Sequence, residues 1–228
     1  MTLNIDLLTG KSAQHIHWLT TSCGIHHKVV KSWQALFIAA KKQGFDLTIA
    51  SGFRDFDRQR LIWNKKFSGQ IQVKDNKNQT IDLKMLSDVE RVKAILTFSA
   101  LPGASRHHWG TDIDVYATNL LPDNQTLQLE PWEYKEQGPF ASLSRWLVAN
   151  AEQFGFYLPY DKYRGGIAAE PWHLSYFPLA TTFQSELTPE LLSRQLSTEE
   201  LFGKSAVLQQ LNEIFSNYIN NIGEHPDE

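Results

Sequence analysis

The sequence predicts an α+β fold, in which a small, mainly antiparallel sheet is flanked by helices and followed by a helical C-terminal extension. Short alternating runs, typical of strands, are separated by longer segments whose apolar residues have helical spacing. From residue 181 onwards only helical spacing remains. A chain of 228 residues fits one large domain or one domain with an appendage. We therefore predict a main domain over residues 1–180 and a helical extension over 181–228.

In the first half of the chain, each predicted element has a local signal. Apolar residues three and four apart predict helices, which end at a glycine or begin at an N-cap such as Ser87. The alternating run after Gly44 predicts a strand, and Pro102 breaks the chain before its central stretch. The predicted order is a short strand or turn near 15–17, a helix over 26–43, a strand over 45–50, a helix over 55–67, a polar insertion over 68–82 that favours a small hairpin, and a helix over 87–98.

The second half follows the same logic. Alternation predicts strands over 111–117 and 167–177, and between them lie a polar loop over 118–138 and a helix over 139–154. In the tail, Pro189 suits the first position of a helix. Ser197 and Glu200 have the spacing of a capping box and predict another helix after it.

Composition excludes several classes of function. The formal charge is −3 and no long basic run is present, so we expect no nucleic-acid partner. No segment approaches the roughly 18 apolar residues that span a bilayer, so no membrane partner is expected. The sequence shows no basic and apolar leader, which predicts a cytoplasmic protein, or a periplasmic or cell-wall protein if a leader was removed. A single cysteine, Cys23, leaves His, Asp and Glu to hold any metal.

Two segments concentrate chemically active side chains. The first is SRHHWGTDID over 105–114, and the second is EPWH over 170–173. Together they contain three histidines, two of them adjacent, a carboxylate seven residues after the first, and a glutamate three residues before the last. This inventory suits a catalytic zinc site, which needs three protein ligands, an open position for water and a carboxylate that moves protons. In an ideal strand Glu170 and His173 face opposite sides, so a bulge or turn at Pro171 is needed to bring them into one cleft.

The two segments resemble the Ser-x-His-x-x-Gly-x-Ala-x-Asp and Glu-x-x-His motifs of the VanY/VanX-like zinc peptidases. That family includes D-alanyl-D-alanine carboxypeptidases and dipeptidases and has a hedgehog-like fold. Upstream, Ser51-Gly-Phe-Arg54, with Gln59 five residues later, is similar to the family's Ser-Gly-[Phe/Tyr]-Arg segment. Three ordered motifs make the resemblance specific, and it covers about residues 26–178.

The resemblance implies one Zn²⁺ per chain, with His107, Asp114 and His173 as its ligands. It also implies that Glu170 is the catalytic base and that Arg54 polarises the scissile carbonyl and stabilises the oxyanion. The Ser-x-His spacing favours the first histidine of the adjacent pair at 107 and 108 as the ligand. An ordinary surface ion pair is the alternative for Arg54.

Ser105, Gln59, Asp112 and Trp172 are predicted to form the substrate-binding surface. For Ser105 the alternative is a turn residue that satisfies the backbone. Gln59 alternatively supports Arg54 or faces solvent, and Trp172 alternatively packs in the core. Asp112 stands where the family motif has Ala. Three roles are open for it: orienting a ligand, which we favour, contacting the substrate amine, or replacing Asp114.

The predicted function is that of a zinc carboxypeptidase whose main domain releases a C-terminal D-amino acid, such as D-Ala, from peptidoglycan-type peptides by metal-activated attack of water. Within the enzyme class the alternatives are a D-Ala-D-Ala dipeptidase, an L,D-carboxypeptidase and a lysin-type endopeptidase. A non-catalytic zinc-bearing binding module is a more distant alternative. The expected partner is a peptidoglycan-derived peptide, and the sequence predicts no oligomeric state.

Overall fold

The computed structural model describes residues 4–225 and confirms the α+β class. Its centre is a four-stranded antiparallel sheet with the strand order β3-β6-β8-β7, and two small hairpins, β1-β2 and β4-β5, lie outside it. The strands are β1 (Ile16–Trp18), β2 (Gly24–His26), β3 (Leu47–Ser51), β4 (Val73–Lys74), β5 (Thr80–Ile81), β6 (Asp112–Ala117), β7 (Phe156–Tyr157) and β8 (His173–Tyr176).

Helices surround this small sheet. The α-helices are α1 (Ile5–Leu8), α2 (Val30–Lys42), α3 (Phe56–Phe67), α4 (Asp88–Leu96), α5 (Ala141–Asn150), α6 (Phe177–Glu186), α7 (Pro189–Ser197), α8 (Lys204–Gln209) and α9 (Leu211–Ile214). Short 3-10 turns are η1 (Leu83–Met85), η2 (Arg106–Trp109), η3 (Thr118–Leu120), η4 (Pro131–Tyr134) and η5 (Ala151–Phe154), and a π-turn, η6 (Phe215–Ile219), follows α9. Within residues 4–225, no helix is both long and apolar enough to cross a membrane.

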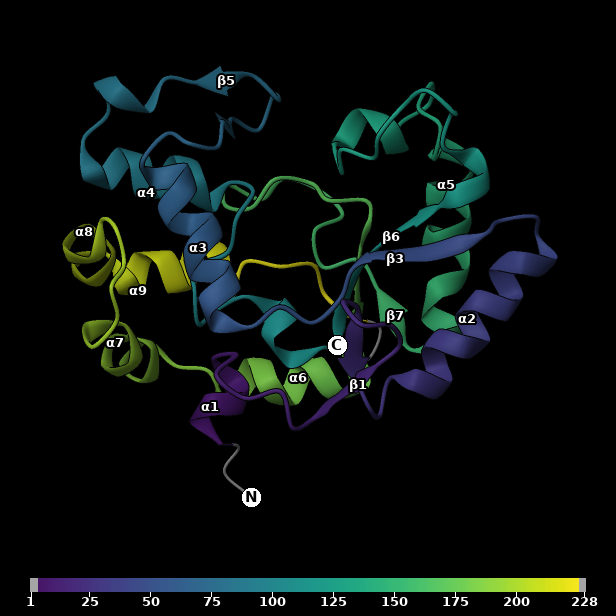
Figure 1. Ribbon diagram of the computed structural model, residues 1–228, viewed down its shortest axis with the longest axis horizontal. Helices are drawn as coiled ribbons and strands as arrows, with labels where there is room; N and C mark the ends of the chain where they lie inside the picture. The colour runs from purple at the N-terminus through teal and green to yellow at the C-terminus, as the bar shows by residue number, and fades with distance from the viewer. Residues whose placement is uncertain (1–3, 226–228) are drawn as a thin grey trace.

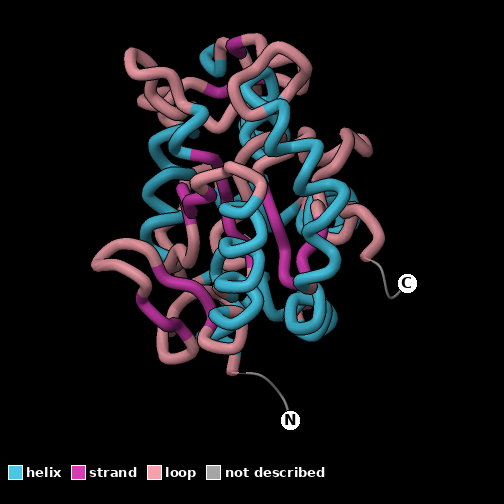
Figure 2. Tube along the Cα trace, turned by 90° about the vertical axis from the view of Figure 1, so that its right-hand side faces the viewer, coloured by secondary structure: helices cyan, strands magenta, loops and turns pink. Residues whose placement is uncertain are grey.

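The core has two parts. Helices α2 and α5 pack with β3, β6 and β8 in one apolar cluster, and α3, α4 and α6 to α9 form the other. In Figure 1 the sheet lies between these two groups of helices, and the view turned by 90° shows helices in front of the short magenta strands (Figure 2). Because helices cover it closely, five of the six residues of β6 are buried. The inside-outside alternation predicted for that strand therefore does not appear as a difference in burial.

The strand register aligns three polar side chains in one row across the sheet. Asp114 of β6 pairs with Ser51 of β3 on one side and with His173 of β8 on the other. Directly paired residues of antiparallel strands project from the same face, with Cβ atoms about 4.5–5.5 Å apart. Segments separated by some sixty residues therefore deliver side chains to a single point.

Most predicted elements are present, and three of them differ from prediction. The helix predicted from residue 26 begins only at Val30, because His26 pairs with Ile16 in the β1-β2 hairpin and its N–H donates to the Gly110 carbonyl at 2.8 Å. The strand predicted over 167–177 is limited to β8. The capping box predicted at Ser197 is wrong, because α7 ends there and the next helix starts at residue 204.

The C-terminal helices share a core with the rest of the chain. Leu192 and Leu196 of α7 belong to the same apolar cluster as Trp63 of α3 and Ile95 of α4. The Trp63 indole N–H also donates to the carbonyl of Phe202 at 3.0 Å. Helix α6 runs across residue 180, and the division of the chain at that position stays a prediction.

This shared core predicts that Leu192→Ala destabilises the whole protein. Leu192 is fully buried, so the substitution removes apolar contacts and leaves a cavity, at a cost of about 2–5 kcal/mol. Leu61→Ala is the matched control, because Leu61 is 54% exposed, and it should cost less than about 0.5 kcal/mol. Urea unfolding of both variants measures the difference, and equal losses would contradict the packing described above.

Candidate metal centre and active site

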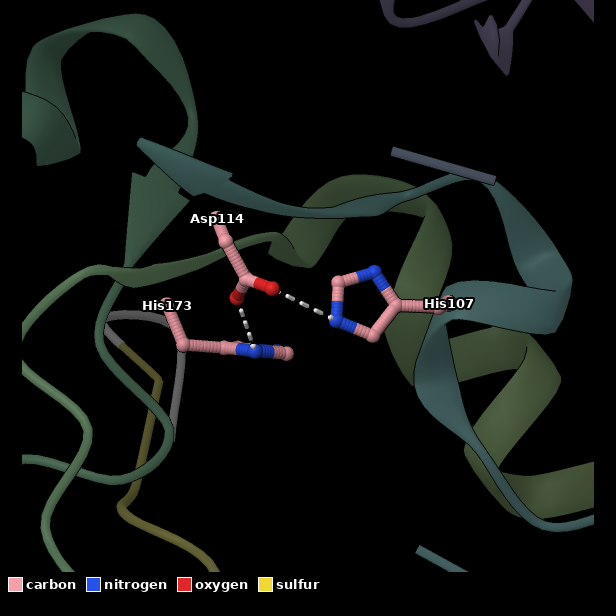
Figure 3. A group of neighbouring side chains, drawn as sticks. All are labelled: His107, Asp114 and His173. Atoms are coloured by element: carbon pink, nitrogen blue, oxygen red, sulfur yellow. Dashed lines mark hydrogen bonds and ion pairs between the residues drawn. The ribbon is translucent and has the colours of Figure 1, made fainter. Parts of the chain in front are cut away.

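His107, Asp114 and His173 meet at one point on the sheet. Each offers one ligand atom, and these atoms all lie within 4.8 Å of one another. Asp114 lies between the two rings: one carboxylate oxygen is 3.3 Å from His107 Nε2 and the other is 3.1 Å from His173 Nδ1 (Figure 3). All three side chains are buried. The structure thus brings together the three residues that the sequence analysis predicted as ligands.

The backbone around His107 fixes which of its nitrogens faces Asp114. His107 Nδ1 lies 2.9 Å from the carbonyl oxygen of Gly52, which can only accept a hydrogen bond. The proton of the neutral ring therefore sits on Nδ1, and Nε2 keeps its lone pair for a metal. Gly52 can approach this closely because it has no side chain: a Cβ there would stand 2.3 Å from the Gly24 carbonyl oxygen.

Glu170 reaches the same point through a turn. The His173 N–H donates to the Glu170 carbonyl at 3.0 Å and the Glu170 N–H donates to the Tyr160 carbonyl at 2.8 Å, so residues 170–173 turn before β8 starts. This is the turn at Pro171 that the spacing required, and it brings a Glu170 carboxylate oxygen to 3.6 Å from His173 Nδ1. Burial raises the pKa of Glu170 to about 7, despite the opposing effect of His173.

Arg54 lies at the end of β3 with its guanidinium held from two sides. Its Nη1 donates to Gln59 Oε1 and its Nη2 donates to Ser51 Oγ, both at 2.9 Å. Gln59 is fully buried beneath it and donates in turn to the Ala100 carbonyl at 2.7 Å. The prediction that Gln59 contacts substrate is therefore wrong, and its alternative role, support of Arg54, fits these contacts.

His108 is excluded as a ligand by its own hydrogen bonds. Its Nδ1 donates to the Arg54 carbonyl at 2.6 Å, and its Nε2 accepts from the Gly103 N–H at 3.0 Å. Burial lowers the pKa of His108 to about 3, so the ring is neutral. Both nitrogens are thus occupied in holding the backbone near Arg54. Trp109 is likewise in the core, with its indole N–H donating to the Leu8 carbonyl at 3.0 Å.

A cavity of about 400 Å³ opens over the three candidate ligands. Arg54, Glu170, Ser105 and Trp172 contribute to its wall. A substrate contact of Ser105 and Trp172 stays a prediction, and Trp172 also packs in the apolar cluster around the sheet. Sequence reasoning missed Lys66 and Tyr160, which also line it. Only the fold could reveal them, because Lys66 looks like one of several lysines on a surface helix and Tyr160 lies in an irregular segment.

Asp112 does not line this cavity. Its side chain is fully buried, and its oxygens accept hydrogen bonds from Arg106, Thr111 and His173. The prediction of a substrate contact is therefore wrong for Asp112, and so is the alternative that it replaces Asp114 in the ligand set. The alternative that it orients a ligand fits its contact with His173.

The electrostatics of the site favour a positive charge at its centre. Burial alone would lower the pKa of His173, but its hydrogen bonds to Asp112 and Asp114 outweigh burial and raise this pKa to about 10. Burial opposes ionisation of Asp114 as well, yet His107 and His173 hold its pKa far below the usual range. Carboxylates that keep their charge in a buried site need a cation beside them.

The donor set fits zinc. Two imidazoles and one carboxylate, with a cavity on the open side, match the catalytic type of site with three protein ligands. A tetrahedral ion with bonds of about 2.0–2.1 Å keeps its ligand atoms about 3.3 Å apart. The three ligand atoms, one from each residue, lie within 4.8 Å of one another, so small shifts of the side chains bring them to this spacing. The fold and the site together define a zinc peptidase of the carboxypeptidase class.

Comparison with known proteins identifies the family. Residues 22–179 match the family model described as VanY, D-alanyl-D-alanine carboxypeptidase. Because this match covers more than half of the chain, the protein belongs to the VanY D-alanyl-D-alanine carboxypeptidase family. An uncharacterised protein of Haemophilus influenzae is 42% identical over 125 residues, which are 54% of this chain and 95% of that protein.

Two solved structures are similar over most of both chains. VanYB in complex with D-alanine-D-alanine has 25% identity and a TM-score of 0.53, covering 83% of this chain and 93% of that one. A variant of the vancomycin-resistance D,D-pentapeptidase VanY in complex with Zn(II) has 26% identity and a TM-score of 0.52, covering 79% and 92%. These likenesses support the zinc interpretation of the donor set.

The metal centre predicts the effect of removing a ligand. His173→Ala should lower bound zinc from about one ion per chain to nearly none after dialysis, because two ligands rarely retain the ion. His17→Ala is the control, since His17 is an exposed histidine away from the site. Atomic absorption of both purified variants provides the measurement. A His173→Ala protein that keeps a full equivalent of zinc would overturn the assignment.

Proposed function

We propose that this protein hydrolyses the last peptide bond of peptidoglycan-type peptides and releases a C-terminal D-amino acid, D-Ala in the simplest case. The observation that carries the proposal is the convergence of Glu170 and Arg54 on the cavity that also holds the three candidate ligands. A zinc-bearing binding module would need neither a free carboxylate nor a guanidinium there. The complex of VanYB with D-alanine-D-alanine supports this choice of substrate.

Glu170 is proposed as the group that moves protons. Zinc held by His107, Asp114 and His173 would supply a Lewis acid and lower the pKa of a water molecule to about 7. The Glu170 carboxylate is positioned by the turn, not by a strand, and it stands beside the metal point without being one of the three ligands. It takes the proton of the attacking water and returns one to the leaving amine.

Arg54 is proposed to stabilise the negative charge that develops on the carbonyl oxygen. The guanidinium is fixed in advance by Gln59 and Ser51, so little reorganisation is needed when that charge appears. His108 contributes by fixing the backbone at the Arg54 carbonyl. Ser105 and Trp172 complete the wall against which the peptide lies.

Lys66 is proposed to bind the free carboxylate at the end of the substrate. Its ammonium lines the same cavity and donates to Ser99 Oγ at 2.6 Å, while no carboxylate within the described part of the chain forms an ion pair with it. Burial lowers the pKa of Lys66 to about 8, so the group is still mainly protonated near pH 7. A partly buried cation that forms no ion pair favours an anionic ligand. A carboxylate anchor is what separates an exopeptidase from an endopeptidase.

The dipeptidase, L,D-carboxypeptidase and endopeptidase alternatives make different demands on the substrate. A dipeptidase prefers free D-Ala-D-Ala, an L,D-carboxypeptidase cleaves between an L- and a D-centre, and an endopeptidase tolerates a blocked C-terminus. Tetra-, penta- and dipeptides therefore distinguish them when D-Ala release is measured for each. We expect the pentapeptide ending in D-Ala-D-Ala to be cleaved fastest.

Glu170→Gln should lower kcat/KM about 10²–10⁴-fold, because the amide cannot accept a proton from water. Bound zinc should stay near one equivalent, since Glu170 lies outside the ligand set. Glu152→Gln, at an exposed glutamate on η5, is the control and should leave both quantities unchanged. D-Ala release and metal content are measured on the same preparations. Unchanged turnover in Glu170→Gln would exclude the proposed role.

Lys66→Met should raise KM for a peptide with a free C-terminal carboxylate and change kcat less, because the lost interaction is with a remote, unreacting group. Wild-type protein should cleave the C-terminally amidated peptide poorly, and Lys66→Met should not worsen that rate. Lys65→Met is the matched control, since Lys65 precedes Lys66 on α3 and its side chain is exposed. Equal cleavage of acid and amide by the wild type would instead indicate an endopeptidase.

A further inference from the structure

A chain of buried polar contacts runs from the metal centre into the C-terminal helices. It starts at His173 and passes through Asp112 and Arg106 to Gln184 on α6. The first three side chains are nearly inaccessible, with Asp112 fully buried and Arg106 only 4% exposed. The predicted mechanism uses neither Asp112 nor Arg106, although a buried ion pair must repay a large desolvation cost.

The two carboxylate oxygens of Asp112 have different hydrogen-bond partners. Oδ1 lies 3.0 Å from His173 Nε2 and also accepts from Arg106 Nε at 2.7 Å. Oδ2 accepts from the Thr111 hydroxyl at 2.6 Å. A carboxylate paired with an arginine can only accept hydrogen bonds, so the nitrogen that faces Oδ1 must be the donor. The Asp112 contact therefore places a proton on His173 Nε2.

This proton position determines what the opposite nitrogen can do. In the neutral ring that a metal requires, protonation of Nε2 leaves the lone pair of His173 on Nδ1, which faces Asp114 and the metal point. The arrangement mirrors that of His107, where the Gly52 carbonyl fixes the proton on the nitrogen away from the centre. The two rings use opposite nitrogens toward the metal, and each has its own acceptor behind it. Outer acceptors of this kind orient the ligand and raise its basicity.

Arg106 holds Asp112 in place with a guanidinium whose own position is fully specified. Nη1 donates to Gln184 Oε1 and Nη2 donates to Ser175 Oγ, both at 2.7 Å, while the group stacks over the Trp109 ring at 4.9 Å. Gln184 donates in turn to the Ile219 carbonyl at 3.1 Å. Gln184 and Ile219 lie outside the segment that matches the family model.

We propose that Asp112 and Arg106 are positioning residues of the metal centre: Asp112 fixes the proton of His173 on Nε2, Arg106 fixes Asp112, and α6 supports Arg106 through Gln184. The inference rests on the zinc site of the proposed function. It assigns a role to an aspartate that stands where the resembling motif has alanine, and it links the C-terminal helices to zinc affinity.

The first test uses the zinc-loaded wild-type protein, with histidine imidazoles labelled with ¹⁵N. The expected NMR result is a His173 ring that is protonated at Nε2 and metal-bound at Nδ1. A ring protonated at Nδ1 and bound through Nε2 would overturn the inference, and no variant has to fold for this outcome. Absence of zinc from the wild type would instead contradict the proposed function.

The second test measures zinc affinity by competition with a chelator. In the double variant Asp112→Ala with Arg106→Met, both buried charges are removed together, which keeps the site neutral and often preserves stability. Its zinc Kd should rise about 10–100-fold, as for other outer-ligand substitutions. Asp112→Asn keeps the size of the side chain and its acceptor oxygen, and it should have a smaller effect in the same direction.

Thr111→Val is the matched control. It removes the hydrogen bond to Oδ2 of the same carboxylate and leaves the Oδ1 contacts with His173 and Arg106 in place. It should lower Tm but keep the zinc Kd within about threefold of wild type. Circular dichroism verifies that each variant is folded. A folded double variant or Asp112→Asn variant with wild-type zinc affinity would mean that the pair serves stability alone, which would overturn the inference.

Discussion

The register between β6 and β8 is the constraint on which the site depends. It sets Asp114 directly opposite His173 and, two positions further along the strands, Asp112 opposite Ser175. A shift by one residue would turn each of these side chains to the other face of the sheet. The Asp114 carboxylate would then point away from His173, and Asp112 would no longer contact Arg106 or His173. Metal centre and supporting network therefore depend on the same strand pairing.

Around this pairing, the protein controls charge and proton position with buried acceptors and donors. A backbone carbonyl stands behind His107 and a carboxylate stands behind His173, so both rings are oriented before any metal arrives. Arg54 and Arg106 both border the cavity, but their guanidinium groups have different partners. Gln59 and Ser51 hold that of Arg54, whereas that of Arg106 forms an ion pair with Asp112. One set of charged groups is therefore proposed to act on the substrate, and a second set is proposed to fix the ligands.

The positions of the motifs and of most helices and strands could be predicted from the sequence, because they depend on local residue spacing. It could not show the pairing of β1 with β2, which moves the start of α2, since that pairing joins residues through space. Gln59 and Asp112 were predicted as substrate contacts because their motif positions lie near reacting groups. Their burial depends on long-range packing, as does the approach of Lys66 to the cavity, and no local pattern encodes either.

The turn at Glu170 shows the opposite case, in which a sequence argument defined what the structure had to contain. The two-residue alternation of a strand would have separated Glu170 from His173, so a turn at Pro171 was required, and the His173-to-Glu170 backbone hydrogen bond provides it. The Glu-x-x-His spacing does not suit a regular strand, and this mismatch correctly located the turn in the active site.

The most direct test of the account is a zinc titration of chelator-stripped protein, with D-Ala release from a pentapeptide ending in D-Ala-D-Ala as the readout. The account predicts no release without zinc and a linear rise that ends at one equivalent per chain. Full release by the stripped protein, or stoichiometric zinc binding with no release, would contradict it.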